Sequence, residues 1–143
     1  MSVGEVCNRL VDLAEPNETV RVAAQRMLQR QVGCLVVVDP TRVPIGILTD
    51  RDLVVKVMAK GLSADETTVQ QVMTINPHFV HEDTPIEDAL RLMRVGSHRR
   101  LPVVDGDGRL IGLVSIDDVL VLIAGEMQSI GRLIERESPS AFG

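Results

Sequence analysis

The chain has almost no aromatic side chains: its 143 residues include no tryptophan, no tyrosine and only two phenylalanines. Proteins that hold single-stranded nucleic acid rely on aromatic rings on which the bases stack. The formal net charge is -5, so the sequence also lacks the basic footprint that nucleic-acid phosphates require. We therefore exclude nucleic acid as a partner, and any planar ring bound here must pack against aliphatic side chains.

Cysteine is scarce, and long apolar runs are missing. The two cysteines, Cys7 and Cys34, make no disulfide framework, which favours a reducing cytoplasm. We interpret Cys34, which begins a buried run, as an inert packed side chain. The apolar runs are too short to cross a bilayer, and the start of the chain has no secretory pattern. The sequence therefore predicts a cytoplasmic protein with no membrane partner.

Residue sets for metal binding and catalysis are also missing. His78 and His81 lie three residues apart but without a cysteine nearby, so we predict no metal site. There is no Ser-His-Asp or Cys-His set and no Gly-x-x-x-x-Gly-Lys phosphate loop. Gly106, Gly108 and Gly112 do not fit a dinucleotide fingerprint, because a strand and not a helix follows them.

The dominant feature of the chain is an internal repeat. Residues 3–60 align with residues 69–126 without a gap at an offset of 66, and 12 of the 58 pairs are identical. Most other pairs in the apolar segments exchange one apolar residue for another. A register that holds through two turns indicates two copies of one unit. Because a unit of about 60 residues is marginal alone, we expect the two copies to pack together.

Each copy has the pattern of an extended lead-in, a helix, two strands and a second helix. Runs of β-branched residues predict the strands, and apolar residues at helical spacing predict the helices. Strands are expected at residues 34–38, 44–48, 101–104 and 110–114, and the second helices at residues 50–60 and 116–124. The first helix of each copy has a start signal. In the first copy the N-cap is Asn17 or Thr19. In the second copy the N-cap is Thr84, followed by Pro85 as the first helical residue and Glu87 as the third, which together form a capping box.

The expected organisation follows from the repeat. Residues 1–60 form the first copy, 61–68 a polar linker, 69–126 the second copy, and 127–143 a helical extension whose end, 138–143, frays. The fold class is α/β (α+β), with two β-α-β-β-α units whose sheets pack face to face about a pseudo-twofold axis. Two related clefts should result, each between a strand end of one copy and a helix start of the other.

Both copies place a hydroxyl three residues before a carboxylate where the second helix begins. These pairs are Thr49 with Asp52, and Ser115 with Asp118. The pattern is typical of a capping box. It also suits a ligand site, because a carboxylate can accept two hydrogen bonds from a vicinal diol and a helix N-terminus attracts anions. Both interpretations stay open, since one group can serve both roles.

The repeat resembles the CBS-domain pair, also called a Bateman module. The residues that carry the resemblance are Gly46-Ile-Leu-Thr-Asp-Arg-Asp52 and Gly112-Leu-Val-Ser-Ile-Asp-Asp118, together with residues 34–39, 72–77, 83–89 and 98–105. It covers nearly all of residues 3–126. The resemblance implies a non-catalytic regulatory module that binds an adenosine-containing ligand: AMP, ADP or ATP, with S-adenosylmethionine or NAD as further candidates. No resident cofactor is implied.

The resemblance also implies roles for individual residues. In the family, the carboxylates that end the two motifs bind ribose hydroxyls, which implies this role for Asp52 and Asp118, and the preceding hydroxyls, here Thr49 and Ser115, assist at ribose or phosphate. Basic residues before the strand bind phosphates, and the matching positions are His98, Arg99 and Arg100. Residues of the lead-in contact adenine, and the matching positions are Thr74, Pro77 and Val80.

The first copy departs from this pattern. Val32, Gly33 and Cys34 stand where the second copy has its basic residues, and Asn8 stands where the second copy has Thr74. We therefore expect two unequal clefts, with Gly33 lining one of them and at most one suited to a phosphate chain. Which cleft the arginines face is left open by the sequence.

Three hypotheses for function remain. The first is a nucleotide sensor that signals to a separate effector protein and pairs as a homodimer through apolar helix faces. The second is a ligand-free dimerisation scaffold of the same fold, in which both aspartates serve only as caps. The third, an enzyme using Asp117, Asp118 or His98 in acid–base work, is not favoured because no third group orients them. The apolar faces expected at the dimer contact are formed by Val54, Val57 and Met58, and by Leu120 and Ile123.

Overall fold

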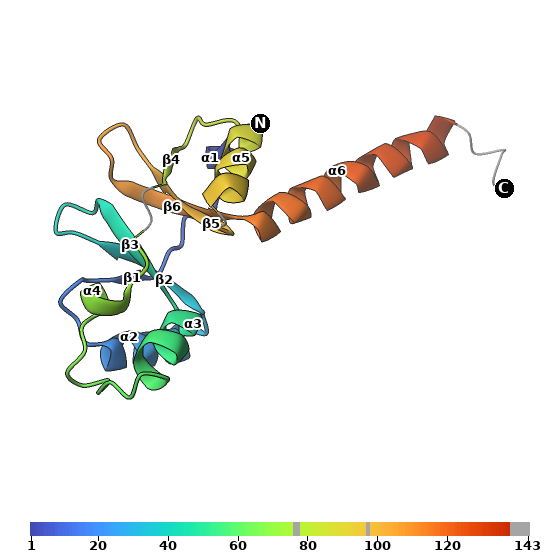
Figure 1. Cartoon of the computed structure of the whole chain (residues 1–143). Helices are drawn as coiled ribbons and strands as arrows, with labels where there is room; N and C mark the ends of the chain where they lie inside the picture. Colours follow the sequence, from blue (N-terminus) through green and yellow to red (C-terminus); the bar gives the residue numbers. More distant parts are fainter. Residues whose placement is uncertain (76–77, 97, 138–143) are drawn as a thin grey trace.

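The computed structural model of the chain describes residues 1–75, 78–96 and 98–137. Within these residues the strands form two three-stranded sheets of the same topology (Figure 1). In each sheet the first strand runs parallel to the second, and the second runs antiparallel to the third. The sheets are β1 (Leu13–Ala14), β2 (Cys34–Val38) and β3 (Pro44–Thr49), and β4 (Val80–His81), β5 (Arg100–Val104) and β6 (Leu110–Ser115). The four long strands confirm the predicted ranges to within one residue.

The first helix of each repeat, α2 (Val20–Arg30) or α5 (Ile86–Gly96), packs on its own sheet. The hydroxyl of Thr19 accepts a hydrogen bond from the Val22 N–H at 3.3 Å, so Thr19 is the cap of α2. Helix α5 begins at Ile86, and the prediction that Pro85 is its first residue is wrong by one position. The Thr84 hydroxyl instead accepts a hydrogen bond from the His81 N–H at 3.1 Å, inside the turn that precedes the helix.

The second helix of the first repeat is not a single α-helix. One α-helical turn, α3 (Asp50–Asp52), passes directly into a π-helix, η1 (Leu53–Met58). The Ala59 N–H donates to the carbonyl of Val54 at 2.8 Å, five residues back. The helix then ends before Gly61, whose φ of 68° is the left-handed conformation that favours glycine. The predicted α-helix at 50–60 is therefore corrected to a short α-helix followed by a π-helix.

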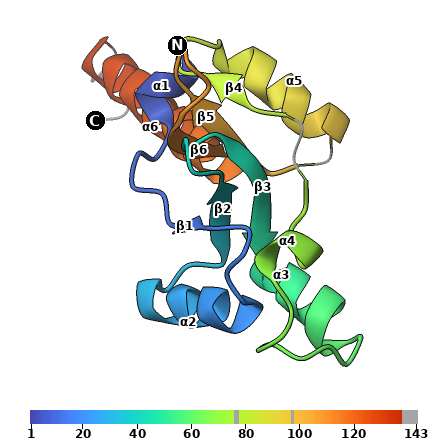
Figure 2. The same ribbon diagram turned by 90° about the vertical axis from the view of Figure 1, so that its left-hand side faces the viewer.

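The lead-in of each repeat, which is the segment before its first long helix (α2 or α5), packs on the other repeat. Each lead-in contains a one-turn helix that was not predicted, α1 (Val3–Val6) or α4 (Val69–Val72). Val3 lies in the core beneath β5 and β6, whereas Val69 and Val72 lie in the core beneath β2 and β3. Figure 2 shows α1 beside the second sheet and α4 beside the first. Each half of the fold is thus completed by the other half's lead-in.

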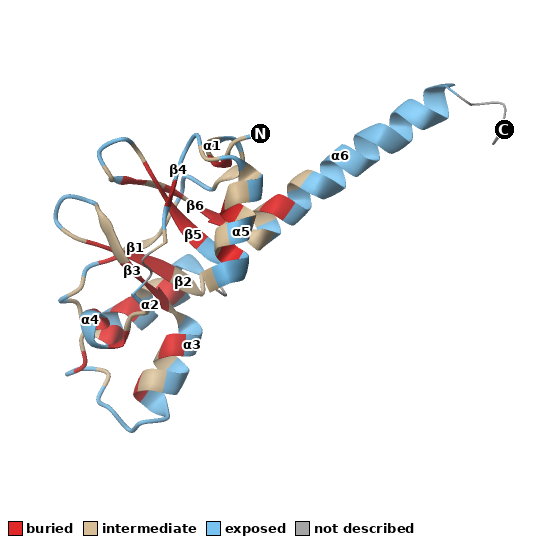
Figure 3. Ribbon diagram, turned by 45° about the horizontal axis from the view of Figure 1, so that its top comes forward, coloured by how far each residue is buried: buried red, intermediate tan, exposed pale blue. Residues whose placement is uncertain are grey.

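The two sheets meet through a third apolar cluster. Val36 and Val38 of β2 pack with Leu110 of β6, and all three side chains are buried. The loops also interlock, because the Leu110 N–H donates to the carbonyl of Arg42 at 2.9 Å. The buried residues in Figure 3 accordingly lie along the strands and on the helix faces turned towards them.

The predicted linker, residues 61–68, packs on the body of the first repeat. Ala64 packs against the first core, Thr67 is buried, and Asp65 forms an ion pair with Arg21. Helix α6 (Ile116–Glu137) continues without a break through the predicted extension and projects from the body (Figure 1). The predicted frayed end, 138–143, lies outside the described residues. Among the helices that the structure describes, none has the length and apolar content needed to cross a membrane.

Candidate functional site

The two hydroxyl–carboxylate pairs have the same local geometry. The Thr49 N–H donates to Oδ2 of Asp52 at 2.9 Å, and the Asp52 N–H donates to the Thr49 hydroxyl at 3.2 Å. Ser115 and Asp118 repeat both hydrogen bonds at the same two distances. These reciprocal bonds satisfy N–H groups at the start of each helix. The capping interpretation is therefore confirmed in both copies, and it leaves Oδ1 of each carboxylate for other partners.

The crossed lead-ins bring the two repeats together beside these helix starts. Asn8, from the first repeat, exchanges two backbone hydrogen bonds of 2.9 Å with Leu113 of β6. Thr74, from the second repeat, exchanges two of the same length with Ile47 of β3. Each helix start therefore faces the lead-in of the other repeat, and a cleft lies at each of these positions.

One cleft, the Asp118 cleft, has a volume of about 260 Å³. Ser115 and Asp118 line it from the second repeat, and apolar side chains line it from both. Arg100 reaches it from the start of β5. Its remaining lining residues are Asn8, Leu10, Val11, Asp12, Val32, Gly33, Cys34 and Leu113. Among the residues described here, no side chain is hydrogen-bonded to Oδ1 of Asp118.

The other cleft, the Thr49 cleft, has a volume of about 290 Å³ and is strongly basic. Its lining residues are Ile47, Thr49, Arg51, Thr74, His98, Arg99 and Arg100. The question left open by the sequence is thereby answered: the basic segment before β5 faces the Thr49 cleft. Arg100 lines both clefts, so it is the one cationic side chain among these residues that the two clefts share.

The structure does not bring all the predicted site residues together. Val80 lies in the core beneath the second sheet and lines neither cleft. Pro77 lies outside the described residues. Asp52 is only 8% exposed and is not among the residues that line the Thr49 cleft. The remaining predicted residues divide between the two clefts.

Asp52 is held by a side chain that the sequence analysis missed. Nζ of Lys56 lies 3.2 Å from Oδ1 of Asp52 and also donates to the Thr74 hydroxyl at 3.2 Å and the Val72 carbonyl at 3.1 Å. The Thr74 hydroxyl in turn donates to Oδ1 of Asp52 at 3.2 Å. The signal was present in the sequence, because residues four apart on a helix are neighbours and Lys56 follows Asp52 by four.

The two cysteines are unpaired thiols. Burial raises the pKa of Cys34 to about 11, although Arg100 acts in the opposite direction. Burial also raises the pKa of Cys7. Because the thiolate is the reactive form, both thiols stay protonated and weakly reactive near neutral pH.

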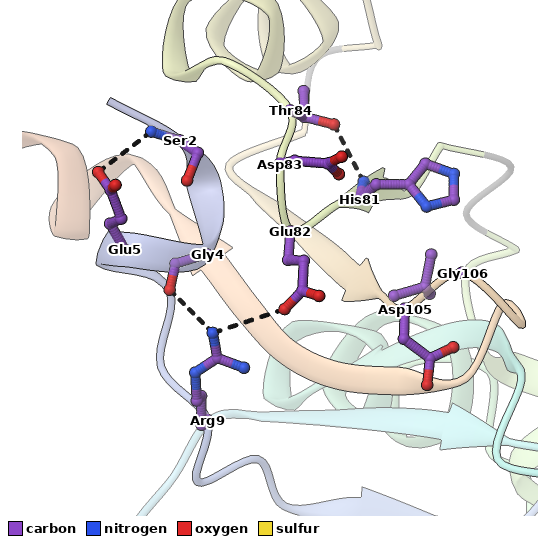
Figure 4. Close-up of a pocket in the computed structure, with 11 residues that line it drawn as sticks. Ser2, Gly4, Glu5, Arg9, His81, Glu82, Asp83, Thr84, Asp105 and Gly106 are labelled. Atoms are coloured by element: carbon purple, nitrogen blue, oxygen red, sulfur yellow. Dashed lines mark hydrogen bonds and ion pairs between the residues drawn. The ribbon is translucent and has the colours of Figure 1, made fainter.

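A hollow larger than either cleft shares no lining residue with them. It measures about 920 Å³ and lies beside α1 and the turn before α5 (Figure 4). Arg9 spans part of it, donating to the Gly4 carbonyl at 3.0 Å and lying 3.8 Å from Glu82. None of the predicted site residues lines it. Over the described ranges, no group of three or more His, Cys, Asp or Glu residues is placed to hold a metal ion.

The fold and the two clefts define a tandem α/β module. Each of its two repeats has a cleft beside the start of its second helix. The family model of the CBS domain matches residues 3–59 and 69–125. The chain therefore belongs to the CBS-domain family and contains two tandem CBS repeats, as the resemblance in its sequence implies.

Relatives and solved structures agree with this assignment. The protein MK0525 of Methanopyrus kandleri is 41% identical over 120 residues, which are 84% of this chain and 61% of that protein. The chain spans only about a fifth of several CBS domain-containing proteins of Arabidopsis thaliana that it also matches. A solved structure of CBSX2 in complex with AMP superposes with a TM-score of 0.73 at 30% identity, covering 89% of this chain and 98% of that one.

A second solved structure adds other ligands. The CBS domain pair of protein MJ0100, in complex with 5'-methylthioadenosine and S-adenosyl-L-methionine, superposes with a TM-score of 0.76 at 26% identity. The match covers 88% of this chain and 98% of that one. The CBS pair is thus a fold that accommodates adenosine-containing ligands in similar proteins.

Proposed function

We propose that this protein is a non-catalytic regulatory module that binds an adenosine-containing ligand in the Asp118 cleft. The observation that carries the proposal is Asp118 itself. Asp118 lines an open cleft. One of its carboxylate oxygens caps α6, and no side chain among the described residues is hydrogen-bonded to the other. A carboxylate in this position can accept hydrogen bonds from both hydroxyls of a ribose.

The rest of the Asp118 cleft suits a nucleoside. Val11, Val32 and Leu113 offer aliphatic surface for a planar base, in a protein with almost no aromatic residues. AMP, 5'-methylthioadenosine and S-adenosylmethionine, bound by the two similar structures, share an adenosine group with a vicinal ribose diol. The shared group is the part that Asp118 and these aliphatic side chains would recognise, with Ser115, Gly33 and Arg100 beside it.

The Thr49 cleft suits the anionic part of a ligand. Arg51, Arg99 and Arg100 supply guanidinium groups, which match phosphate oxygens in geometry and charge. Thr49 and Thr74 add hydroxyl groups and His98 adds a ring nitrogen. We place the phosphates of AMP, ADP or ATP at Arg100, which lines both clefts, or at the other arginines of the Thr49 cleft.

A ligand panel tests the proposal. AMP, ADP, ATP, NAD, S-adenosylmethionine and adenosine, each at about 100 times its dissociation constant, should raise the free energy of unfolding by about 2.7 kcal/mol. The measurement is thermal unfolding with and without ligand, with calorimetry for affinity and inosine as the comparison for base recognition. If no member of the panel shifts the melting temperature or produces heat, the ligand-free scaffold replaces the sensor. Steady turnover of any member would instead favour an enzyme.

The output of such a module needs other proteins. Ligand binding would favour one arrangement of the two repeats, and an effector protein in trans would respond to the change in population. The setting we propose is a reducing compartment such as the cytoplasm, in which the free Cys7 and Cys34 would remain thiols. A homodimer would provide the platform for the effector.

The dimer contact that we propose lies on α6. Every residue of α6 from 123 to 137 is exposed, and its apolar side chains recur at alternating spacings of three and four. This spacing is typical of the seam between paired helices. The seam comprises Leu120, Ile123, Met127, Ile130 and Ile134. Exposed Val54 and Met58 could add to it, but Val57 is 6% exposed and belongs to the core, so its predicted place in the contact is wrong.

Solution mass tests the dimer. The wild type should sediment with twice the chain mass of 15.6 kDa, and the double variant Ile123→Glu, Ile130→Glu should sediment as a monomer that still melts cooperatively. Ser129→Glu, on the opposite side of α6, is the matched control and should remain dimeric. A wild type that is monomeric at every concentration tested would contradict this part of the proposal.

A further inference from the structure

The two CBS repeats are not equivalent at their carboxylates, although the caps around them are the same. The repeat offset of 66 pairs Lys56 with Leu122 and Thr74 with Asn8. Asp52 is therefore next to an ammonium from its own repeat and a hydroxyl from the lead-in of the other repeat. At the two matching positions, Asp118 has an aliphatic side chain from its own repeat and an amide from the lead-in of the other.

Each N–H donor of the Lys56 ammonium has an oxygen acceptor within reach. The ammonium carries three N–H donors, and three oxygen acceptors lie within reach, from Asp52, Thr74 and Val72, at 3.1–3.2 Å. The Thr74 hydroxyl accepts from Lys56 and donates to Asp52, which closes the network. The Asp52 side chain is only 10% exposed, whereas that of Lys56 is 37% exposed, so the carboxylate end of the network is the part that is shielded from water.

The groups at the matching positions beside Asp118 make no hydrogen bond to its carboxylate among the described residues. The side-chain oxygen of Asn8 accepts a hydrogen bond from the Leu10 N–H at 2.9 Å, within its own segment. Leu122 has no polar atom to offer. Asp118, which lines its cleft, consequently has one oxygen without a hydrogen-bonding side chain among the described residues, whereas both oxygens of Asp52 are engaged within the protein.

We propose that Lys56 is an internal counter-ion that closes Asp52 to a ribose, so that only the Asp118 cleft binds a vicinal diol. This inference rests on the proposed function, because it assumes that Asp118 receives the sugar. A ribose at Asp52 would have to replace the ammonium and the Thr74 hydroxyl by two neutral hydroxyls, leaving a half-buried ammonium with one partner fewer. That exchange is unfavourable, because a half-buried charge that loses a partner is costly. The Thr49 cleft is left as an anion site formed by its arginines.

The test is the number of adenosine molecules bound per chain, measured by calorimetry and equilibrium dialysis on the full chain. Adenosine is the probe because it has the diol but no phosphate for the arginines. The wild type should bind one, and Lys56→Leu, which copies the second repeat, should bind two. Adding Thr74→Asn to Lys56→Leu reproduces both second-repeat neighbours and should also bind two. Adding Asp52→Asn to Lys56→Leu should return the number to one.

Asp52→Asn alone supplies the matched control: it should leave the number of sites at one and keep the dissociation constant within about twofold of the wild-type value. If the wild type binds one adenosine and both Lys56→Leu variants, with cooperative melting curves, still bind one, this inference is wrong and the proposed function stands. Two sites in the wild type would also overturn the inference alone. No binding by the wild type or by either variant would contradict the proposed function and the inference together.

Discussion

Asp118→Asn should weaken adenosine and AMP binding by about 100-fold. The substitution replaces a charged acceptor by a neutral one at two ribose hydroxyls, and a hydrogen bond to a charged group contributes about 1.5–3 kcal/mol. A loss of about 3 kcal/mol in total corresponds to a factor of about 100 in the dissociation constant. The measurement is calorimetric titration at constant ionic strength.

The cap makes the choice of variant important. The amide oxygen of Asn can still accept the hydrogen bond that Asp118 takes from the Ser115 N–H, so the start of α6 is preserved. Ser115→Ala is the matched control, because it removes the hydroxyl that receives the Asp118 N–H but keeps the carboxylate. It should lower stability by about 1 kcal/mol and weaken binding by less than tenfold. Equal effects of the two variants on binding would mean that Asp118 acts only as a cap.

Deleting residues 1–8 should destabilise the second half of the molecule. The deletion removes the fully buried Val3 and four backbone hydrogen bonds that tie this segment to residues 82–84 and 113. Burial of one valine contributes about 1.5–3 kcal/mol and each of the four hydrogen bonds about 1 kcal/mol, so the loss is about 6 kcal/mol. For a chain of this size, the melting temperature should fall by roughly 15 °C.

Hydrogen exchange locates the effect. Protection should decrease in β5 and β6, since α1 packs beneath these strands and not beneath β2 and β3. Removal of residues 127–137 is the control: it deletes more residues, but all of them are exposed, so the melting temperature of the monomeric chain should change by only a few degrees. Loss of protection confined to β2 and β3 would contradict the crossed lead-ins.

Local chemistry made much of the fold predictable. The strand that begins at Cys34 and its counterpart were identifiable because runs of β-branched residues suit buried strands. The cap pairs were identifiable because a capping box depends only on residues three positions apart. The repeat register also encodes a helix start. Thr19 caps α2 and aligns with Pro85, so the register itself places the start of α5 at Ile86.

The site was less predictable. Lys56 could have been found, because its distance of four residues from Asp52 is a helical spacing. Thr74 was named from the family resemblance, but its contact with Asp52 was not predictable, because the two residues are 22 apart in sequence and meet only through the pairing of Thr74 with Ile47. The π-helical turn at 53–58 has no signal of its own in composition.

The sequence by itself determined two copies of one unit, each with a capped helix start carrying a carboxylate, because repeats, periodicity and capping are properties of neighbouring residues. The tertiary structure decided which half each lead-in completes, which cleft the arginines face, and which of the two carboxylates remains available. The physical reason is that these three outcomes depend on contacts between residues far apart in the chain. Such contacts are set by how the two sheets pack, and no local pattern encodes them.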